Sequence, residues 1–370
     1  MKVFLAGTSL LPNYGGPAYS VCRLARALTE LGAEVGLWAP DQSAATTPLL
    51  SADSCVRRMA GTEAEALDSF GRPDVLHDNG IWLRHNHRLA ELSVRNCIPR
   101  MVSTRGMLER WAFDYKRWKK RIAWWLYQEN DLRRAHCVHA TAEPEARSLK
   151  SFDLDLPVVV IPNGVDVPED RPKFKGMESA TGARGRPKTA LFLGRIHPKK
   201  GLLVLVEAWA RVRPDNWQLK IAGPDENGHR KQVEDAVSIM GLNEVISFIG
   251  PLDGQAKQSA FFDSDLFVLP TYSENFGTVV AEALAHRLPV LTTTGTPWSM
   301  LPEQGCGWWV APTVEGVAEG LQQATSQKYE TLQTMGAKGR AFVAKDLGWD
   351  LIAKKFIATY ERLLQRRPPL

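Results

Sequence analysis

The sequence predicts an α/β fold made of two doubly wound, Rossmann-like domains, and three observations support this prediction. The chain has 370 residues, which is long for one domain and sufficient for two. Short apolar runs alternate with longer helical segments in both halves, as expected for parallel sheets with helices on both faces. Between the halves, Val167 to Lys188 is rich in Pro, Gly and charged residues, which is typical of a linker.

Short apolar runs in the first half predict parallel strands. They are rich in β-branched residues and largely lack polar alternation, as in strands that are covered on both faces. Helices are predicted between them, over Ala18–Leu31 and Arg110–Leu132. The predicted strands are Val3–Ala6, Val35–Trp38, Val75–His77, Met101–Ser103, Cys137–Ala140 and Val158–Ile161.

The second half repeats the pattern and ends in a helix over about Trp349–Leu364. We place the first domain at 1–167 and the second at 168–348, and expect the helix at about 349–370 to pack back on the first. Two such domains facing each other would form a central cleft at the carboxyl ends of both sheets, where these folds bind ligands. The predicted strands are Ala190–Leu193, Leu219–Ala222, Val245–Ile249, Leu266–Leu269 and Val290–Thr292.

Composition narrows the function classes. Hydrophobic residues make up 44% and charged residues 24%, which argues against disorder and fibrous repeats. The five cysteines are dispersed, so neither a zinc site nor a disulfide framework is indicated. No apolar stretch is long enough to span a membrane, and we expect a cytoplasmic protein. The net charge of +5 fits a protein that handles nucleotide diphosphates or acidic lipid headgroups, although such a small excess also occurs without function. We expect no nucleic-acid partner.

A basic turn opens the second domain. In LFLGRIHPKKG, Gly194 and Arg195 follow a predicted strand, and Lys199, Lys200 and Gly201 precede a helix. Cations at a helix start make an anion site. The spacing is not that of a P-loop. The alternative is a solvated basic turn.

Two glutamates follow the strand LFVLPT. Glu274 lies in the loop, and Glu282 lies eight positions on, inside a helix that begins near Phe276. A carboxylate at Glu282 can accept hydrogen bonds from ribose hydroxyls, and Glu274 can reach a sugar. An exposed, solvated pair is the alternative, but the apolar run beside Glu282 favours burial, where a charge needs a partner.

These motifs resemble the signature of the retaining GT-B glycosyltransferases, family 4 in particular. The resemblance rests on ENFGTVVAEALA, LGRIHPKKG, IAGPDENG, FIGPL and IPNGVD in this family's order, and on YGGPAYSVCRLARALTELGAEV near the N-terminus. It covers essentially the whole chain. The segments RGMLERWAFDYKRWKKR and TTGTPWSMLPEQGCGWWV are similar to members that build bacterial surface polysaccharides such as O-antigen, capsule or exopolysaccharide.

The resemblance implies a role for each matching residue. Arg195 and Lys200 would bind the diphosphate of a UDP- or GDP-linked sugar and stabilise the leaving group. Glu274 would contact the donor sugar, and Glu282 the ribose. The remaining implied contacts are Asn275, Phe276, Gly277 and Thr278 at the diphosphate and sugar, Gly250 beside the base, and Gly15 and Gly16 where the first loop approaches donor and acceptor.

The first domain departs from the family pattern at one place. In DVLHDNGIW the family often has two histidines around one residue, but here only His77 is present and Asn79 takes the second place. His77 is therefore a candidate catalytic residue with a strand-end core histidine as the alternative. Asn79 could hydrogen-bond the acceptor or donor sugar. Arg105, which ends the next strand, is a candidate for binding an anionic group of the acceptor.

The resemblance also implies a mechanism without metal or cofactor. Retaining members of this class favour a front-face displacement, in which the protein positions the reactants and stabilises the departing diphosphate. Asp263-Ser264-Asp265 has the spacing of a metal-binding pair of aspartates, but it leads directly into a strand. We interpret it as a turn. The expected enzyme is a retaining, metal-independent glycosyltransferase of the hexosyltransferase type.

Other classes of protein fit less well. A dehydrogenase would need G-x-G-x-x-G after the first strand, where the sequence reads AGTSLLPNYGG. A nucleotide-sugar epimerase of the same fold remains an alternative, and analysis of the product would distinguish it. A non-catalytic nucleotide-sugar binder would be expected to have lost some of Arg195, Lys200, Glu274 and Glu282.

The helix after Arg110 combines an apolar stripe with clustered cations. Trp111, Tyr115, Trp118, Ile122 and Trp125 are spaced to share one helical face. We hypothesise a peripheral helix on the inner face of the cytoplasmic membrane that brings the site to a lipid-linked saccharide acceptor. The alternative is that the stripe packs on the sheet. The cations are Lys116, Arg117, Lys119, Lys120 and Arg121.

Overall fold

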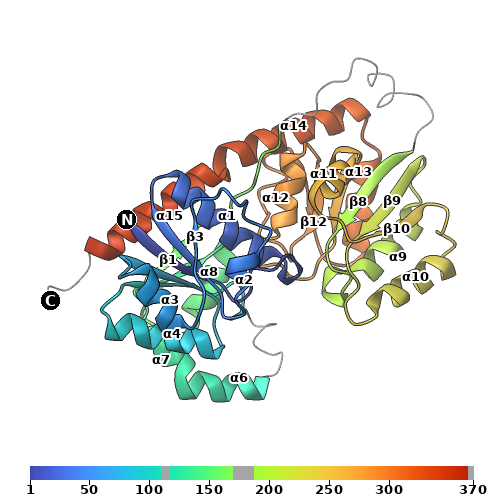
Figure 1. Ribbon diagram of the computed structural model, residues 1–370. Helices are drawn as coiled ribbons and strands as arrows, with labels where there is room; N and C mark the ends of the chain where they lie inside the picture. The colour runs from blue at the N-terminus through green and yellow to red at the C-terminus, as the bar shows by residue number, and fades with distance from the viewer. Residues whose placement is uncertain (110–116, 170–186, 366–370) are drawn as a thin grey trace. The chain divides into compact units, whose positions relative to one another are not determined.

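The computed structural model describes residues 1–109, 117–169 and 187–365 (Figure 1). The chain divides into two compact units, one of residues 1–164 with 349–370 and one of residues 165–348. In the described parts of the chain, every strand pairing is parallel. The prediction of two doubly wound α/β units is therefore confirmed.

The first unit contains a sheet that, over the described residues, has seven strands in the order β3-β2-β1-β4-β5-β6-β7. The strand order switches direction between β1 and β4, which is where doubly wound sheets place their ligand sites. Its central strands are almost entirely buried. The strands are β1 (Lys2–Ala6), β2 (Glu34–Trp38), β3 (Arg57–Arg58), β4 (Val75–Asn79), β5 (Arg100–Ser103), β6 (Cys137–Ala140) and β7 (Val158–Val160).

Helices of the first unit pack their apolar stripes on this sheet. In α1 (Gly16–Glu30), Val21, Leu24, Ala25 and Leu28 are buried at helical spacing. The last helix of the chain, α15 (Trp349–Gln365), packs beside α1 in the same core. The other helices are α2 (Ser43–Thr46), α3 (Glu63–Phe70), α4 (Arg84–Arg95), α6 (Arg117–Ala123), α7 (Glu129–Arg133) and α8 (Glu143–Lys150), with the 3-10 turn η1 (Pro12–Tyr14) and the π-helical turn η2 (Trp124–Gln128).

The second unit has one large core around a sheet of strand order β10-β9-β8-β11-β12-β13. The strands are β8 (Lys188–Leu193), β9 (Trp217–Ala222), β10 (Ile246–Gly250), β11 (Leu266–Leu269), β12 (Val290–Thr293) and β13 (Gly307–Val310). The helices are α9 (Leu202–Val212), α10 (His229–Ile239), α11 (Gly254–Phe262), α12 (Thr278–Ala285), α13 (Val314–Thr325) and α14 (Tyr329–Asp346), with the 3-10 turn η3 (Pro198–Lys200).

Candidate functional site

The basic turn after β8 is held against the loop that follows β11. The backbone N–H of Tyr272 and the hydroxyl of Thr271 both donate to the carbonyl of Lys199, at 2.9 and 3.1 Å. Gly201 has φ +70°, and a Cβ there would lie 2.1 Å from the carbonyl oxygen of Pro270. Only glycine fits this close approach. The two loops therefore present their side chains together at the carboxyl edge of the sheet.

Lys200 and Glu274 form an ion pair at this edge. The ammonium of Lys200 contacts a carboxylate oxygen of Glu274, and the two side chains are only 14% and 16% exposed. The backbone N–H of Glu274 also donates to the carbonyl of Gly295, at 2.7 Å. A cation and a carboxylate so shielded from water interact strongly with an arriving charged or hydroxylated ligand. The structure thus brings together two of the residues that the sequence assigned to the reaction.

The start of α12 is fixed by aromatic packing. Gly277 precedes the helix with φ +74°, and Thr278 is its first residue. Phe276 packs on Trp298, with ring centroids 5.4 Å apart, and the Trp298 indole donates to the Phe276 carbonyl at 2.6 Å. These contacts hold the helix N-terminus that follows Asn275 in place, and its orphan backbone N–H groups favour an anion.

Glu282 lies further along α12 and is paired with a residue that sequence reasoning missed. The Lys257 ammonium, from α11, lies 2.7 Å from the Glu282 carboxylate, and both side chains are about a quarter exposed. Nothing in the segment GQAKQSA marks Lys257 as functional. Its pairing with Glu282 arises only because the fold brings these residues of α11 and α12 together.

Arg195 is not part of the Lys200–Glu274 pair. Its side chain is 62% exposed and forms an ion pair at 2.6 Å with Glu226, from the loop after β9. Gly250 ends β10 with φ +75°, and a Cβ there would meet nothing within 4 Å. The space over Gly250 is therefore open, as the expected contact with a base requires.

The Asp263-Ser264-Asp265 segment is used within the fold. The backbone N–H of Thr189 donates to the Asp265 carboxylate at 2.8 Å, and the Asp265 N–H donates to the Thr189 carbonyl at 2.8 Å. These bonds join the start of β11 to β8, as expected for a turn. Over the described residues, no group of three or more His, Cys, Asp or Glu side chains is placed to hold a metal ion.

In the first unit, His77 is fully buried and both ring nitrogens have partners. Nδ1 lies 2.7 Å from the Tyr360 hydroxyl, and Nε2 lies 2.7 Å from the Ser103 hydroxyl. Ser103 also contacts Nδ1 of His139 at 2.6 Å, and Nε2 of His139 contacts the Ile161 carbonyl at 2.8 Å. These contacts favour the core histidine over the catalytic one. Burial lowers the pKa of His77 well below its ordinary value, so the ring is neutral.

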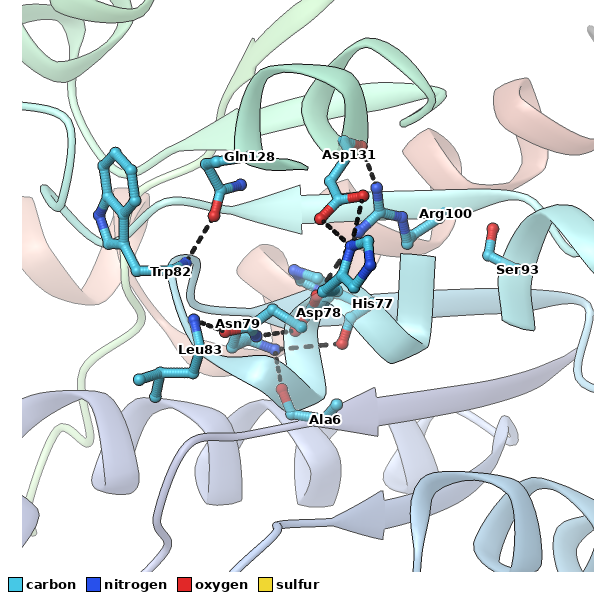
Figure 2. Close-up of polar contacts among 12 residues, drawn as sticks. Ala6, His77, Asp78, Asn79, Trp82, Leu83, Ser93, Arg100, Gln128 and Asp131 are labelled. Atoms are coloured by element: carbon cyan, nitrogen blue, oxygen red, sulfur yellow. Dashed lines mark hydrogen bonds and ion pairs between the residues drawn. The ribbon is translucent and has the colours of Figure 1, made fainter. Parts of the chain in front are cut away.

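Asn79 and Arg105 meet at the strand ends of the same sheet. The Asn79 amide nitrogen donates to the Ala6 carbonyl at 3.2 Å, which Figure 2 shows, and its oxygen accepts from Arg105 at 2.5 Å. A second amide oxygen, that of Asn163 after β7, accepts from Arg105 at 3.0 Å. Arg105 has φ +53°, a conformation that costs energy for a non-glycine residue.

The first loop leaves room for a ligand. Gly15 has φ +83° and precedes α1, and Gly16 is the first residue of that helix. A Cβ at either glycine would meet nothing within 4 Å. The immediate surroundings of both glycines are therefore open.

A cluster of buried charged side chains lies between the first sheet and two of its helices (Figure 2). The carboxylate of Asp78, on β4, accepts from the Asn86 amide at 2.8 Å and lies 3.6 Å from the Arg100 guanidinium. Burial raises the pKa of Asp78 to about 7. The Arg100 guanidinium also donates to the carbonyl of Asp131, whose carboxylate lies 2.8 Å from His87. These contacts join β4 and β5 to α4 and α7.

The helical segment formed by α6 and η2 does not pack its apolar stripe on the sheet. Trp118, Ile122 and Trp125 are 80%, 56% and 82% exposed, and Leu126 is 62% exposed. The alternative of a stripe buried on the sheet is therefore wrong for these residues. Trp111 and Tyr115 lie outside the described residues, as does Lys116. The helix packs instead through its other face.

That inner face is held against the loop after β4. The backbone N–H of Trp82 donates to the Gln128 side chain at 2.6 Å, as Figure 2 shows. The Tyr127 hydroxyl donates to the Trp82 carbonyl, also at 2.6 Å. The Trp82 ring packs on Trp124 and carries the Lys120 ammonium 5.7 Å from its centroid. No helix in the described parts of the chain has the length and apolar character needed to cross a membrane.

Family models match both halves of the chain. Residues 14–169 match the model of glycosyltransferase family 4, and residues 175–342 match that of glycosyl transferases group 1. A D-inositol 3-phosphate glycosyltransferase of Kribbella flavida is 26% identical over 84% of this chain and 76% of its own. A phosphatidyl-myo-inositol mannosyltransferase of Mycobacterium leprae is 29% identical over 58% of this chain. The chain spans only 56% of that protein, and 46% of a related uncharacterized glycosyltransferase of Methanocaldococcus jannaschii.

Solved structures show the same fold. Sucrose-phosphate synthase of Thermosynechococcus elongatus has a TM-score of 0.79 at 20% identity, covering 99% of this chain and 100% of its own. HepE of Anabaena, in complex with UDP and glucose, has a TM-score of 0.73 at 18% identity, covering 98% and 100%. The fold class is therefore GT-B, as predicted, and both family models support a glycosyltransferase of the family 4 type.

Proposed function

Since this GT-B chain matches glycosyltransferase models in both halves, we propose that it transfers a sugar from a UDP- or GDP-linked donor to an acceptor with retention. The observation that carries the proposal is the shielded Lys200–Glu274 pair at the strand ends of the second unit. The two residues belong to separate motifs 74 positions apart in the sequence, and the fold brings them into contact.

Donor binding follows from the charges of the second unit. The diphosphate would lie at the start of α12 and take Lys200 as counter-ion, with Arg195 moving from Glu226 to join it. Two cations and a helix N-terminus then supply the positive charge that a metal ion supplies in other enzymes. Glu274, released from Lys200, would contact the sugar. Glu282, held by Lys257, would accept the ribose hydroxyls.

The chemical step needs no protein nucleophile. The bond from C1 of the sugar to the diphosphate oxygen breaks, and a bond from C1 to the acceptor oxygen forms on the same face. The acceptor proton passes to the departing phosphate oxygen. The protein accelerates this step by positioning the reactants and by stabilising charge on the leaving group.

The acceptor would bind at the first unit, over Gly15, Asn79 and Arg105. Similarity to surface-polysaccharide enzymes supports a lipid-linked saccharide, with the protein in the cytoplasm at the inner membrane face. The exposed stripe supports this location, because tryptophans beside cations suit the interface of an anionic membrane. Since the opposite face of this helix is clamped to Trp82, the stripe is presented outward by a fixed support.

A panel of nucleotide sugars tests the proposal. A ligand that binds only the folded protein raises its melting temperature by mass action. We expect one UDP- or GDP-sugar to stabilise the wild type in the presence of chelator, and Lys200→Gln to lose this effect. An exposed-site control, Arg211→Gln, should keep it. If no nucleotide sugar stabilises the wild type, or if Lys200→Gln responds normally, the proposed donor site is wrong.

A further inference from the structure

Arg105 carries a positive charge that the first unit does not neutralise. Among the described residues it forms no ion pair, and its two hydrogen bonds go to the neutral amide oxygens of Asn79 and Asn163. Its Nε atom is enclosed and has no hydrogen-bond partner. A charge in such surroundings is unfavourable unless an opposite charge approaches it.

The carboxylate of Glu145 attracts Arg105 electrostatically, but its hydrogen bonds go to other groups. Both carboxylate oxygens of Glu145 are occupied by bonds from Thr104, Gly106 and Thr141. Glu145 therefore acts on Arg105 only through space. Burial outweighs this attraction and lowers the pKa of Arg105 to about 10. Even so, the guanidinium is charged at every physiological pH.

The surroundings of Arg105 fix its position and leave donors available. Asn79 is itself held by the Ala6 and His77 carbonyls, so its oxygen faces the guanidinium. The three residues lie at or just after the carboxyl ends of β4, β5 and β7, which are parallel strands of one sheet. The two bonds use one hydrogen on each terminal nitrogen, and Arg105 as a whole residue is partly exposed. The second hydrogens remain for a ligand.

We propose that Arg105, framed by Asn79 and Asn163, binds an oxyanion of the acceptor, either a phosphate or a carboxylate. This inference rests on the proposed function and narrows it, because it requires an anionic acceptor. A planar guanidinium binds both groups through paired hydrogen bonds. The bound oxyanion supplies the negative charge with which Arg105 forms an ion pair.

Amide hydrogen exchange on the full chain tests the proposal with simple anions. Inorganic phosphate is the phosphate probe, acetate the carboxylate probe, and sodium chloride of equal ionic strength the control. We expect phosphate, acetate or both to slow exchange at 103–107, and chloride to leave it unchanged. The more protective anion identifies the class of acceptor. The wild type and Lys200→Gln should agree, which separates this site from the donor site.

Arg105→Gln should weaken the binding of the protective anion by about 10- to 100-fold in Kd, the usual loss for a charge-assisted hydrogen bond. Arg105→Lys should retain part of the protection by the anion. If exchange in β5 shows that Arg105→Gln is misfolded, Arg105→Lys is used in its place. Arg26→Gln, which removes an exposed charge on α1, should behave like the wild type. Absence of protection in the wild type, or full protection in both Arg105 variants, overturns the anion site. The proposed function fails separately, if the wild type binds no nucleotide sugar.

Discussion

The phenol oxygen of Tyr360 lies 2.7 Å from Nδ1 of His77, which joins the last helix of the chain to the middle of the first sheet. Because the Ile161 carbonyl can only accept, Nε2 of His139 donates to it, and its Nδ1 accepts from Ser103. It follows that Nε2 of His77 donates to Ser103 and Nδ1 accepts from Tyr360. One directed chain of hydrogen bonds thus spans four elements.

Tyr360→Phe should destabilise the first unit by about 1–3 kcal/mol, because it leaves a buried acceptor on His77 without a donor. Hydrogen exchange of β4 and β5 measures this change. Tyr329→Phe, in α14 of the second unit, is the matched control and should leave the same amides unaffected. Unchanged exchange in Tyr360→Phe would show that this hydrogen bond does not support the sheet.

The stability of the first unit should fall as the pH drops from 6.5 towards 4. Burial lowers the pKa of His139 from 6.5 to about 4, so the unfolded chain binds a proton in this range and the folded chain does not. The fall should be smaller in His139→Gln. Asp78 acts in the opposite direction, because its raised pKa makes folding less favourable as the pH rises. Comparison of the variant with the wild type cancels that contribution, and equal pH profiles would contradict the assignment.

Lys200→Ala and Arg195→Ala should each reduce turnover by about 100- to 1000-fold while the fold survives, the usual loss when a charge partner of the transition state is removed. Steady-state kinetics with the donor identified by the panel measures the loss. The control Arg211→Ala removes an exposed cation of α9 and should retain turnover. Near-normal turnover in both variants would restore the interpretation of this segment as a solvated turn.

Anionic liposomes should sediment the protein at low salt and release it at high salt, because screening confines the attraction to about a Debye length. Changing Lys116, Lys119 and Lys120 to Glu should abolish binding. So should Trp118→Ser with Trp125→Ser. Ile239→Ser removes a side chain that is 84% exposed on α10, and it should bind like the wild type. Equal binding to neutral liposomes, or none to anionic ones, would favour a soluble acceptor.

Most of the fold was predictable because buried parallel strands are nearly continuous apolar runs. Cys137–Ala140 and Leu266–Leu269 have the predicted bounds, and other strands differ by one or two residues at their ends. Among the residues that the structure describes, the two strands that were not predicted are edge strands. Arg57–Arg58 has no apolar residue, and Gly307–Val310 is a short run after a long turn.

The site was predictable only where a motif names its residues. Arg195 and Glu282 could be identified, but their ion-pair partners Glu226 and Lys257 could not, because those pairings arise from the packing of loops and helices. The burial of His77 likewise depends on Tyr360, which is 283 residues away. The exposed stripe was left open for a related reason: periodicity shows that residues share a face, not what that face contacts.

The anomeric configuration of the product tests the central claim most directly. The protein is incubated with the nucleotide sugar selected by the panel, an acceptor and excess chelator, and the product is followed by NMR. We predict a new glycosidic bond with the configuration of the donor, formed at an undiminished rate without divalent metal. An inverted linkage, a strict need for Mg²⁺ or Mn²⁺, or conversion of the donor to an epimeric nucleotide sugar without transfer would contradict it.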